Sequence, residues 1–129
     1  MGIRVDESQW PVVTARWQGA VRDEEVKSFL AWMEHWLARE QRFGLLLDAR
    51  AAGLLSRAQR ATILAYMKRH AAPSAKFLVQ ALVINNAVVR ALYNSIRRVF
   101  PHPYPSRIFT LPKPAREWLE AQLGVTPPP

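Results

Sequence analysis

Two short runs that are almost wholly apolar constrain the fold of this chain most strongly. They are FGLLL at residues 43–47 and FLVQALVI at residues 77–84. Runs of this length are typical of strands buried on both faces, which occur mainly in parallel or mixed sheets. Each run is followed by a segment in which apolar residues have helical spacing, as a crossover between parallel strands requires. The sequence therefore predicts an α/β fold.

The remaining segments continue this alternation of strands and helices. In chain order we predict strands at 3–5 and 12–17, a helix at 23–40, the strand at 43–47, a helix at 57–71, the strand at 77–84, a helix at 86–99, a strand at 107–110 and a last helix between Pro114 and Gly124. The order is ββαβαβαβα, which predicts a mixed sheet with parallel later strands and with helices packed on it. We expect one domain over residues 1–124 and a disordered tail over residues 125–129.

Local motifs support the helix boundaries and their buried faces. Ser56 and Gln59 have the spacing of a capping box, and Asn85-Asn86 can cap the helix at 86–99. That helix has one apolar stripe, which we expect to face the sheet and which consists of Val88, Val89, Leu92, Tyr93, Ile96 and Phe100. Pro11 suggests that the strand at 12–17 begins at a sheet edge or after a bend.

Composition excludes several classes of chemistry. The chain has no cysteine, which rules out disulfides, thiolate catalysis and cysteine-based metal sites. The three histidines, His35, His70 and His102, are far apart in the sequence and have no metal-ligand spacing. No nucleotide-binding or hydrolase motif occurs. We therefore predict a protein that is not an enzyme, with no catalytic residues, no metal and no cofactor.

Charge is distributed very unevenly along this basic chain, whose formal net charge is +8. Residues 49–116 contain no Asp or Glu but 12 Lys or Arg, whereas residues 1–48 contain eight acids and six bases. This asymmetry indicates an acidic partner, such as a protein surface, nucleic acid, nucleotide or anionic lipid. An equally weighted alternative is a solvated surface that is simply rich in arginine.

Asp48 and Ser56 each admit a functional and a structural interpretation. Asp48 is a possible phosphoacceptor, but the sequence offers no further carboxylates to hold Mg²⁺ beside it. The alternative, which we favour, is a strand-end aspartate that accepts loop N–H groups or pairs with Arg50. Ser56 is a possible phosphorylation site flanked by Arg57 and Arg60. The favoured alternative is a plain helix cap, because Gln59 completes the capping box.

Four strings resemble the STAS-like domains, the fold of bacterial anti-sigma-factor antagonists. They are TARWQGAVRDEEV, FGLLLDAR, ALVINNAVVRALYN and RIFTLPKPAREWL, and together they span almost the whole chain. The chain is most similar to short stand-alone bacterial proteins of this type, which relate loosely to the lipid-binding CRAL-TRIO modules. The resemblance implies a single STAS-like domain with a regulatory role.

The resemblance also implies a specific place for a phosphorylated hydroxyl. In the antagonists a Ser or Thr closely follows the strand-end Asp, at the start of the next helix. Here Ala49 follows Asp48, and Ser56 is the first hydroxyl after it. Ser56 can take the antagonist position only if the loop differs from theirs.

We therefore predict a non-catalytic STAS-like regulatory module of bacterial signalling that binds a partner protein through a basic helix surface. The predicted partner-binding residues are Asp48, Arg50, Ser56, Arg57, Arg60, Arg90 and Arg97. The alternatives are binding of a lipid-like or other small apolar ligand, and nucleic-acid binding through the arginines. We expect an acidic protein partner, with self-association through the strand at 12–17 or the tryptophan-bearing helix at 23–40 as a further possibility.

The first ten residues, MGIRVDESQW, contain no apolar run of signal-peptide length. No segment reaches about 18 uncharged apolar residues, the length that a transmembrane helix needs. We expect no transmembrane segment and a cytoplasmic protein.

Overall fold

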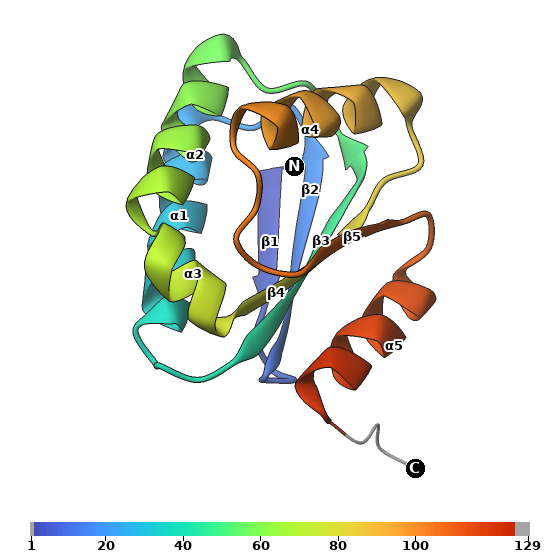
Figure 1. Ribbon diagram of the computed structural model, residues 1–129. Helices are drawn as coiled ribbons and strands as arrows, with labels where there is room; N and C mark the ends of the chain where they lie inside the picture. Colours follow the sequence, from blue (N-terminus) through green and yellow to red (C-terminus); the bar gives the residue numbers. More distant parts are fainter. Residues whose placement is uncertain (1, 126–129) are drawn as a thin grey trace.

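The computed structural model describes residues 2–125 as five strands and five helices. Apart from Val125, the predicted tail at 125–129 lies outside this range. The elements are β1 (Gly2–Asp6), β2 (Val12–Gly19), α1 (Asp23–Leu37), β3 (Phe43–Ala52), α2 (Arg57–Arg69), α3 (Ala71–Phe77), β4 (Leu78–Val83), α4 (Ala87–Val99), β5 (Ser106–Phe109) and α5 (Pro112–Leu123). The predicted order is confirmed, with α3 as an additional short helix (Figure 1).

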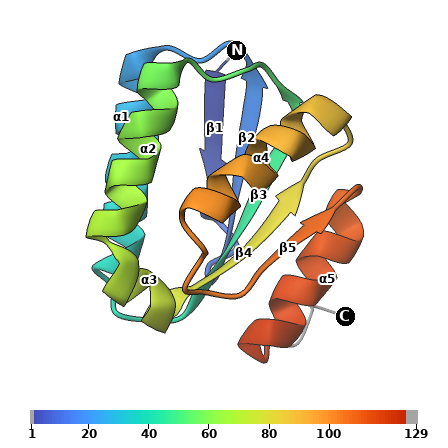
Figure 2. The same ribbon diagram turned by 45° about the horizontal axis from the view of Figure 1, so that its top comes forward.

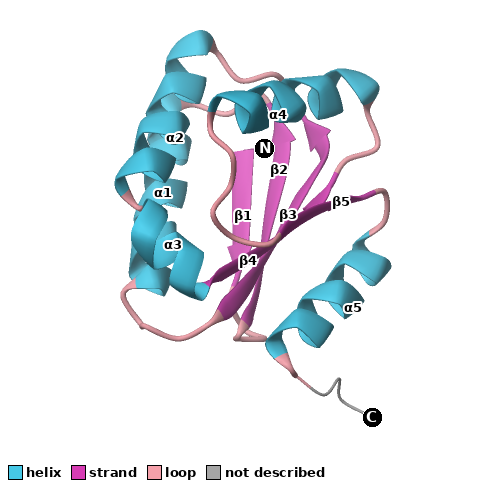
Figure 3. Ribbon diagram, viewed as in Figure 1, coloured by secondary structure: helices cyan, strands magenta, loops and turns pink. Residues whose placement is uncertain are grey.

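One mixed sheet organises the chain, and its strands follow the sequence order β1-β2-β3-β4-β5. β1 and β2 are antiparallel, and every later pair is parallel, as predicted. Because crossovers between parallel strands are right-handed, a sheet that grows in one direction places all its crossover helices on one face. α1 to α4 accordingly lie on one face, and α5, which follows the last strand, lies on the other (Figures 2 and 3).

Alternating side chains of the central strands fill a core on each side of the sheet. On the crossover-helix face, Leu45 packs with Trp17 of β2 and with Phe29 and Trp36 of α1. On the other face, Leu46 packs with Leu119 of α5. The two apolar runs of the sequence are therefore strands buried on both faces, which is what their composition predicts.

Two predicted boundaries were wrong because tertiary contacts extend or divide an element. β3 continues five residues beyond Leu47, and its last residues pair with β2 after a register shift in β2 between Arg16 and Gln18. Backbone pairing with a neighbouring strand thus overrides the low strand propensity of the sequence ARAA. The predicted helix at 57–71 ends at Arg69, and α3 follows with Pro73 in its first turn, where proline is tolerated.

Three further expectations need correction. The strand at 12–17 is not an edge strand, because β1 pairs along one side of it and β3 along the other. Pro11 ends a turn over residues 8–11, so the alternative that the strand begins after a bend is confirmed, and the Pro11 carbonyl accepts a bond from Gly44 N at 2.8 Å. In α4, Val88 belongs to the predicted inward stripe but is 61% exposed. The helix at 23–40 is also shorter than predicted and ends at Leu37.

Candidate functional site

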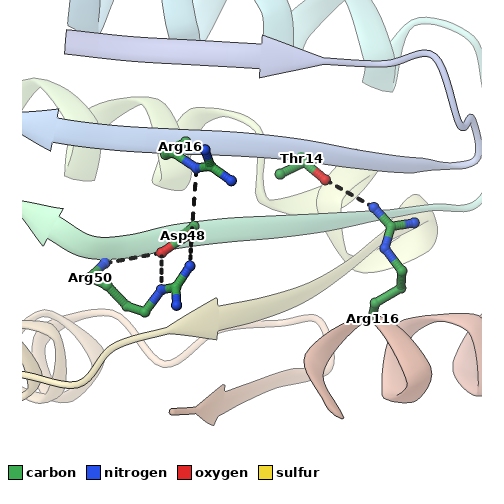
Figure 4. Close-up of polar contacts among 5 residues, drawn as sticks. All are labelled: Thr14, Arg16, Asp48, Arg50 and Arg116. Atoms are coloured by element: carbon green, nitrogen blue, oxygen red, sulfur yellow. Dashed lines mark hydrogen bonds and ion pairs between the residues drawn. The ribbon is translucent and has the colours of Figure 1, made fainter. Parts of the chain in front are cut away.

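Asp48 lies within β3, where strand register places it beside Arg16 of β2. Arg50, two residues further along β3, projects to the same face because side chains alternate along a strand. Its Nε donates to Asp48 Oδ1 at 3.0 Å and its Nη2 donates to Oδ2 at 2.8 Å, while Arg16 Nε lies 3.7 Å from Oδ2 (Figure 4). We call Arg16, Asp48 and Arg50 the Asp48 cluster.

The electrostatics of this cluster favour the structural interpretation of Asp48. Hydrogen bonds from the Arg50 guanidinium hold the pKa of Asp48 below its ordinary value, although burial acts in the opposite direction. The carboxylate is therefore ionised and occupied by its own neighbours. The predicted pairing with Arg50 is confirmed, whereas the predicted position at a strand end is wrong because β3 runs on to Ala52.

The Asp48 cluster lies on the α5 face of the sheet, in a region of polar side chains. Arg116 of α5 reaches this face and donates from Nη2 to Thr14 Oγ1 at 3.2 Å (Figure 4). No pattern in the sequence singled out Arg16 or Arg116 for this site. Strand alternation could have placed Arg16 on one face of β2, but its partner depends on the β2–β3 register, which the sequence does not display.

Ser56 is the N-cap of α2, and the predicted capping box is confirmed. Its Oγ accepts from Gln59 N at 3.0 Å, and Gln59 Oε1 accepts from Ser56 N at 3.0 Å. Gln59 also ties the start of α2 to the turn before α1, because its Nε2 donates to Val21 O at 2.8 Å. Since β3 ends at Ala52, only three residues separate Ser56 from the strand.

The other predicted site residues lie on α2 and α4, on the crossover-helix side of the sheet. We call Ser56, Arg57, Arg60, Arg90 and Arg97 the helical basic surface. Arg57, Arg90 and Arg97 are exposed, and among the described residues none of the four arginines forms an ion pair. Arg60 instead donates from Nη1 to Leu55 O at 3.0 Å. The end of α4 that bears Arg97 is directed toward α2 (Figures 1 and 2).

The structure therefore divides the predicted site between two faces. Leu47 and Ala49 face the crossover helices, where they line a pocket, so the intervening Asp48 faces α5. Asp48 and Arg50 are brought together with Arg16, while Ser56, Arg57 and Arg60 lie with α4 on the opposite side. No single surface contains all seven predicted residues.

A pocket lies between the sheet and the crossover helices, the location that the small-ligand alternative requires, although the sequence did not identify its lining residues. Its volume is about 180 Å³. The wall is predominantly apolar and is formed by all four crossover helices, the sheet and the loop after α4. Its members from the sheet include Leu45, Leu47, Leu78, Gln80 and Leu82, Ile84 follows directly after β4, and those from α4 are Val89, Leu92, Tyr93 and Ile96. We call this the apolar pocket.

A small polar network closes one part of the apolar pocket. Tyr93 Oη lies 2.7 Å from Ser106 Oγ and 3.2 Å from His102 Nδ1, and the His102 ring stacks on Tyr104. Burial lowers the pKa of His102 to about 4, and the nearby Arg97 acts in the same direction. Burial also raises the pKa of Tyr66 to about 12. Near neutral pH these wall residues are therefore uncharged.

Within residues 2–125, no group of three or more His, Asp or Glu side chains is arranged to hold a metal ion. None of the helices in this range is long and apolar enough to cross a membrane.

Comparison with known proteins gives a result for structure but not for sequence. No protein-family model and no curated protein sequence matches the chain. A crystal structure from Shewanella loihica, an uncharacterized DUF3478-family protein described as having a SpoIIAA-like fold, matches with a TM-score of 0.68 and 17% identity. The match covers 92% of each chain. The fold is SpoIIAA-like.

A second protein shares this SpoIIAA-like fold. It is SiaC from Pseudomonas aeruginosa, solved in complex with the diguanylate cyclase SiaD, of which it is the activator. The match has a TM-score of 0.58 and 16% identity, and it covers 83% of this chain and 90% of the other. The resemblance to STAS-like domains that the sequence suggested is thus confirmed at the level of the fold.

Proposed function

We propose that this protein is a non-catalytic regulatory module that acts by binding a partner protein in bacterial signalling. The observation that carries the proposal is the similarity of its fold to SiaC, an activator solved in complex with the enzyme it activates. A shared fold does not by itself transfer function. The surface of this chain supplies the second line of support.

The helical basic surface is the contact region that we propose. Its exposed arginines have no carboxylate partner among the described residues, so their charges are available to another molecule. Arginine suits this role because its planar guanidinium binds carboxylates at two points. The Asp48 cluster is less suitable, since Asp48 already neutralises much of the charge of Arg50 and Arg16. We therefore expect an acidic partner that binds on the α2–α4 side.

Ser56 is the proposed modification site within this surface. A phosphate on Ser56 would lie at the N-terminus of α2, where backbone amides favour negative charge. The phosphate would also place a charge of about −2 beside Arg57 and Arg60. The proposal can be tested with Ser56→Asp against Ser56→Asn, because both residues are good N-caps and only one is charged. Weaker partner binding by the aspartate variant alone supports it, and equal binding by both contradicts it.

Affinity capture from a native bacterial lysate, with bound protein, nucleic acid and lipid analysed together, tests the proposed function. The test variant is Arg90→Glu with Arg97→Glu, which reverses two exposed charges on α4. The matched control is Lys27→Glu with Arg42→Glu, which reverses two exposed charges outside the helical basic surface. Both variants have the same net charge, so nonspecific electrostatics affects them equally.

We expect one protein to be captured stoichiometrically by the wild type and the control, and lost from the α4 variant. Its binding should weaken as salt is raised, because exposed charges are screened. Equal capture by both variants would show that the contact lies elsewhere. Nucleic acid without a protein partner would overturn the proposal in favour of binding through phosphate contacts.

A further inference from the structure

The apolar pocket has the size and wall of a binding site for a small molecule. Its volume of about 180 Å³ exceeds that of an engineered cavity of about 150 Å³ that binds benzene. Well-packed protein interiors contain few voids of this size. The space corresponds to an aromatic ring with a short substituent, or to a short alkyl chain of similar volume.

Gln80 places a polar side chain in this apolar wall. It lies on β4, its side chain faces the pocket, and the residue is only 8% exposed. Its backbone N–H donates to Pro105 O, but among the described residues its side-chain amide has no hydrogen-bond partner. An amide in an apolar wall offers a ligand both a hydrogen-bond donor and a hydrogen-bond acceptor. A ligand with a hydrogen-bonding group can pair with this amide.

The wall favours a neutral ligand over an ionised one. Its lining residues include no Asp, Glu, Lys or Arg, and low pKa keeps His102 uncharged near neutral pH. Burying a charge without an opposite charge or a full set of hydrogen bonds is strongly unfavourable. Three wall residues, Trp17, Tyr66 and His102, each contain a buried polar atom without a partner in the described structure, and the polar groups available here are neutral.

α4 forms a loosely held side of the pocket. It contributes Val89, Leu92 and Ile96 to the wall, yet it contains no fully buried residue. Leu54, at the start of the loop before α2, also lines the pocket and is 63% exposed, so the pocket reaches the surface. A helix with little buried area can move at low energetic cost, which gives a small molecule a route of entry.

We propose that the apolar pocket binds a small, neutral, mostly apolar molecule whose single polar group hydrogen-bonds to the Gln80 amide. This binding activity is separate from the proposed partner interaction and does not depend on it. The ligand class is aromatic or short-chain aliphatic, with a carbonyl or hydroxyl oxygen as its polar group.

Three probes of similar size distinguish the elements of this proposal. Acetophenone is neutral and has one carbonyl oxygen, α-methylstyrene has the same shape without the oxygen, and benzoate has a negative charge. Binding to the full chain is followed by NMR, through methyl signals of Leu45, Leu82 and Ile96 and the indole N–H signal of Trp17. We expect acetophenone and α-methylstyrene to shift these signals and benzoate to leave them unchanged.

Two variants with a matched control locate the site. Ala49→Leu fills part of the pocket and should weaken the binding of both neutral probes. The control, Ala51→Leu, makes the same change at an exposed position of the same strand and should leave their binding unchanged. Gln80→Met keeps the length of the side chain and removes the amide. It should weaken the binding of acetophenone roughly twofold to tenfold, the equivalent of one hydrogen bond, and leave the binding of α-methylstyrene unchanged.

Several outcomes overturn the proposal. If neither neutral probe shifts the pocket signals at its solubility limit, the pocket is not a binding site for this class. If benzoate binds as tightly as acetophenone, the neutral class is wrong. If Gln80→Met weakens the binding of both neutral probes equally, the Gln80 side chain affects binding through packing and forms no hydrogen bond with the ligand. The Gln80→Met result remains decisive even if Ala49→Leu fails to fold.

Discussion

Arg50 holds the carboxylate of Asp48 at two points, with Nε 3.0 Å from Oδ1 and Nη2 2.8 Å from Oδ2. The backbone N–H of Arg50 adds a third bond to Oδ1 at 3.2 Å. Three donors from one residue thus fix a carboxylate that is almost wholly buried within β3. The pair anchors the polar region of the sheet, where Arg16 joins it from β2.

Replacing Asp48 with Asn should lower the free energy of unfolding by about 1–2 kcal/mol, because it weakens charge-assisted hydrogen bonds and leaves two arginines without their counter-ion. Part of the effect is screened, since the Arg50 side chain is 34% exposed. Urea denaturation measures the change. Asp6→Asn, an exposed change on the edge strand β1, is the control, and an equal loss in both variants would contradict the prediction.

Stability should fall as pH decreases from 7 to 5, because His102 has a folded pKa of about 4 and an ordinary value of 6.5. Between these values the unfolded chain binds a proton that the folded protein does not, so acid favours unfolding. Phe100, Tyr93, Tyr104 and Arg97 surround the ring, and none of them is an acid that would stabilise its charged form.

The expected loss over this pH interval is about 1–2 kcal/mol, which is less than full linkage because the ring is partly exposed. Thermal unfolding at pH 7 and pH 5 measures it. His102→Gln should remove this part of the pH dependence, whereas His35→Gln, at an exposed position, should retain it. An unchanged dependence in His102→Gln would show that another group is responsible.

Ser56→Ala should destabilise the protein by about 0.5–2 kcal/mol, because the N-cap of α2 loses the oxygen that accepts from Gln59 N. Ser56→Asn should destabilise the protein much less, since asparagine is an equally good N-cap residue. Chemical denaturation of both variants measures the difference. If alanine and asparagine have the same effect, the capping bond contributes little to stability.

Gly44→Val should destabilise the packing of α5 on the sheet. A Cβ at Gly44 would lie 3.1 Å from Leu119 Cδ2 and 3.2 Å from Leu123 Cδ1, and valine adds two further methyl groups in this space. We expect a loss of about 1–3 kcal/mol, together with faster amide exchange in α5. Ala51→Val, exposed on the same strand, is the control. If the variant loses stability but amide exchange in α5 is not faster, the strain caused by the valine side chain lies elsewhere than at the contact with α5.

Several features of the fold were predictable because they depend on short-range sequence patterns. Apolar runs of strand length identified β3 and β4, and the helical spacing of apolar residues identified the helices between them. Capping is similarly local, so Ser56 with Gln59 and Asn86 were recognised at the helix starts that the structure shows. The alternation of these elements is what made the α/β class and the STAS-like resemblance visible.

The candidate site was less predictable because it depends on which strands become neighbours. Asp48 was recognised as a partner of Arg50, which is two residues away. Its contact with Arg16 requires the parallel register of β2 and β3, and a shift of one residue would place Arg16 on the other face. The same strand alternation separates Asp48 from Arg57 and Arg60, which had been assigned to one surface with it.

The sequence by itself determined the type and order of the elements, the local caps and the unequal charge of the two parts of the chain. Only the tertiary structure decided the length of β3, the side of the sheet that each helix covers, and the space left between α4 and the sheet. The physical reason is the distance along the chain over which each effect acts. Periodicity and capping act within one element, whereas register, handedness and packing volume arise only when separate elements meet.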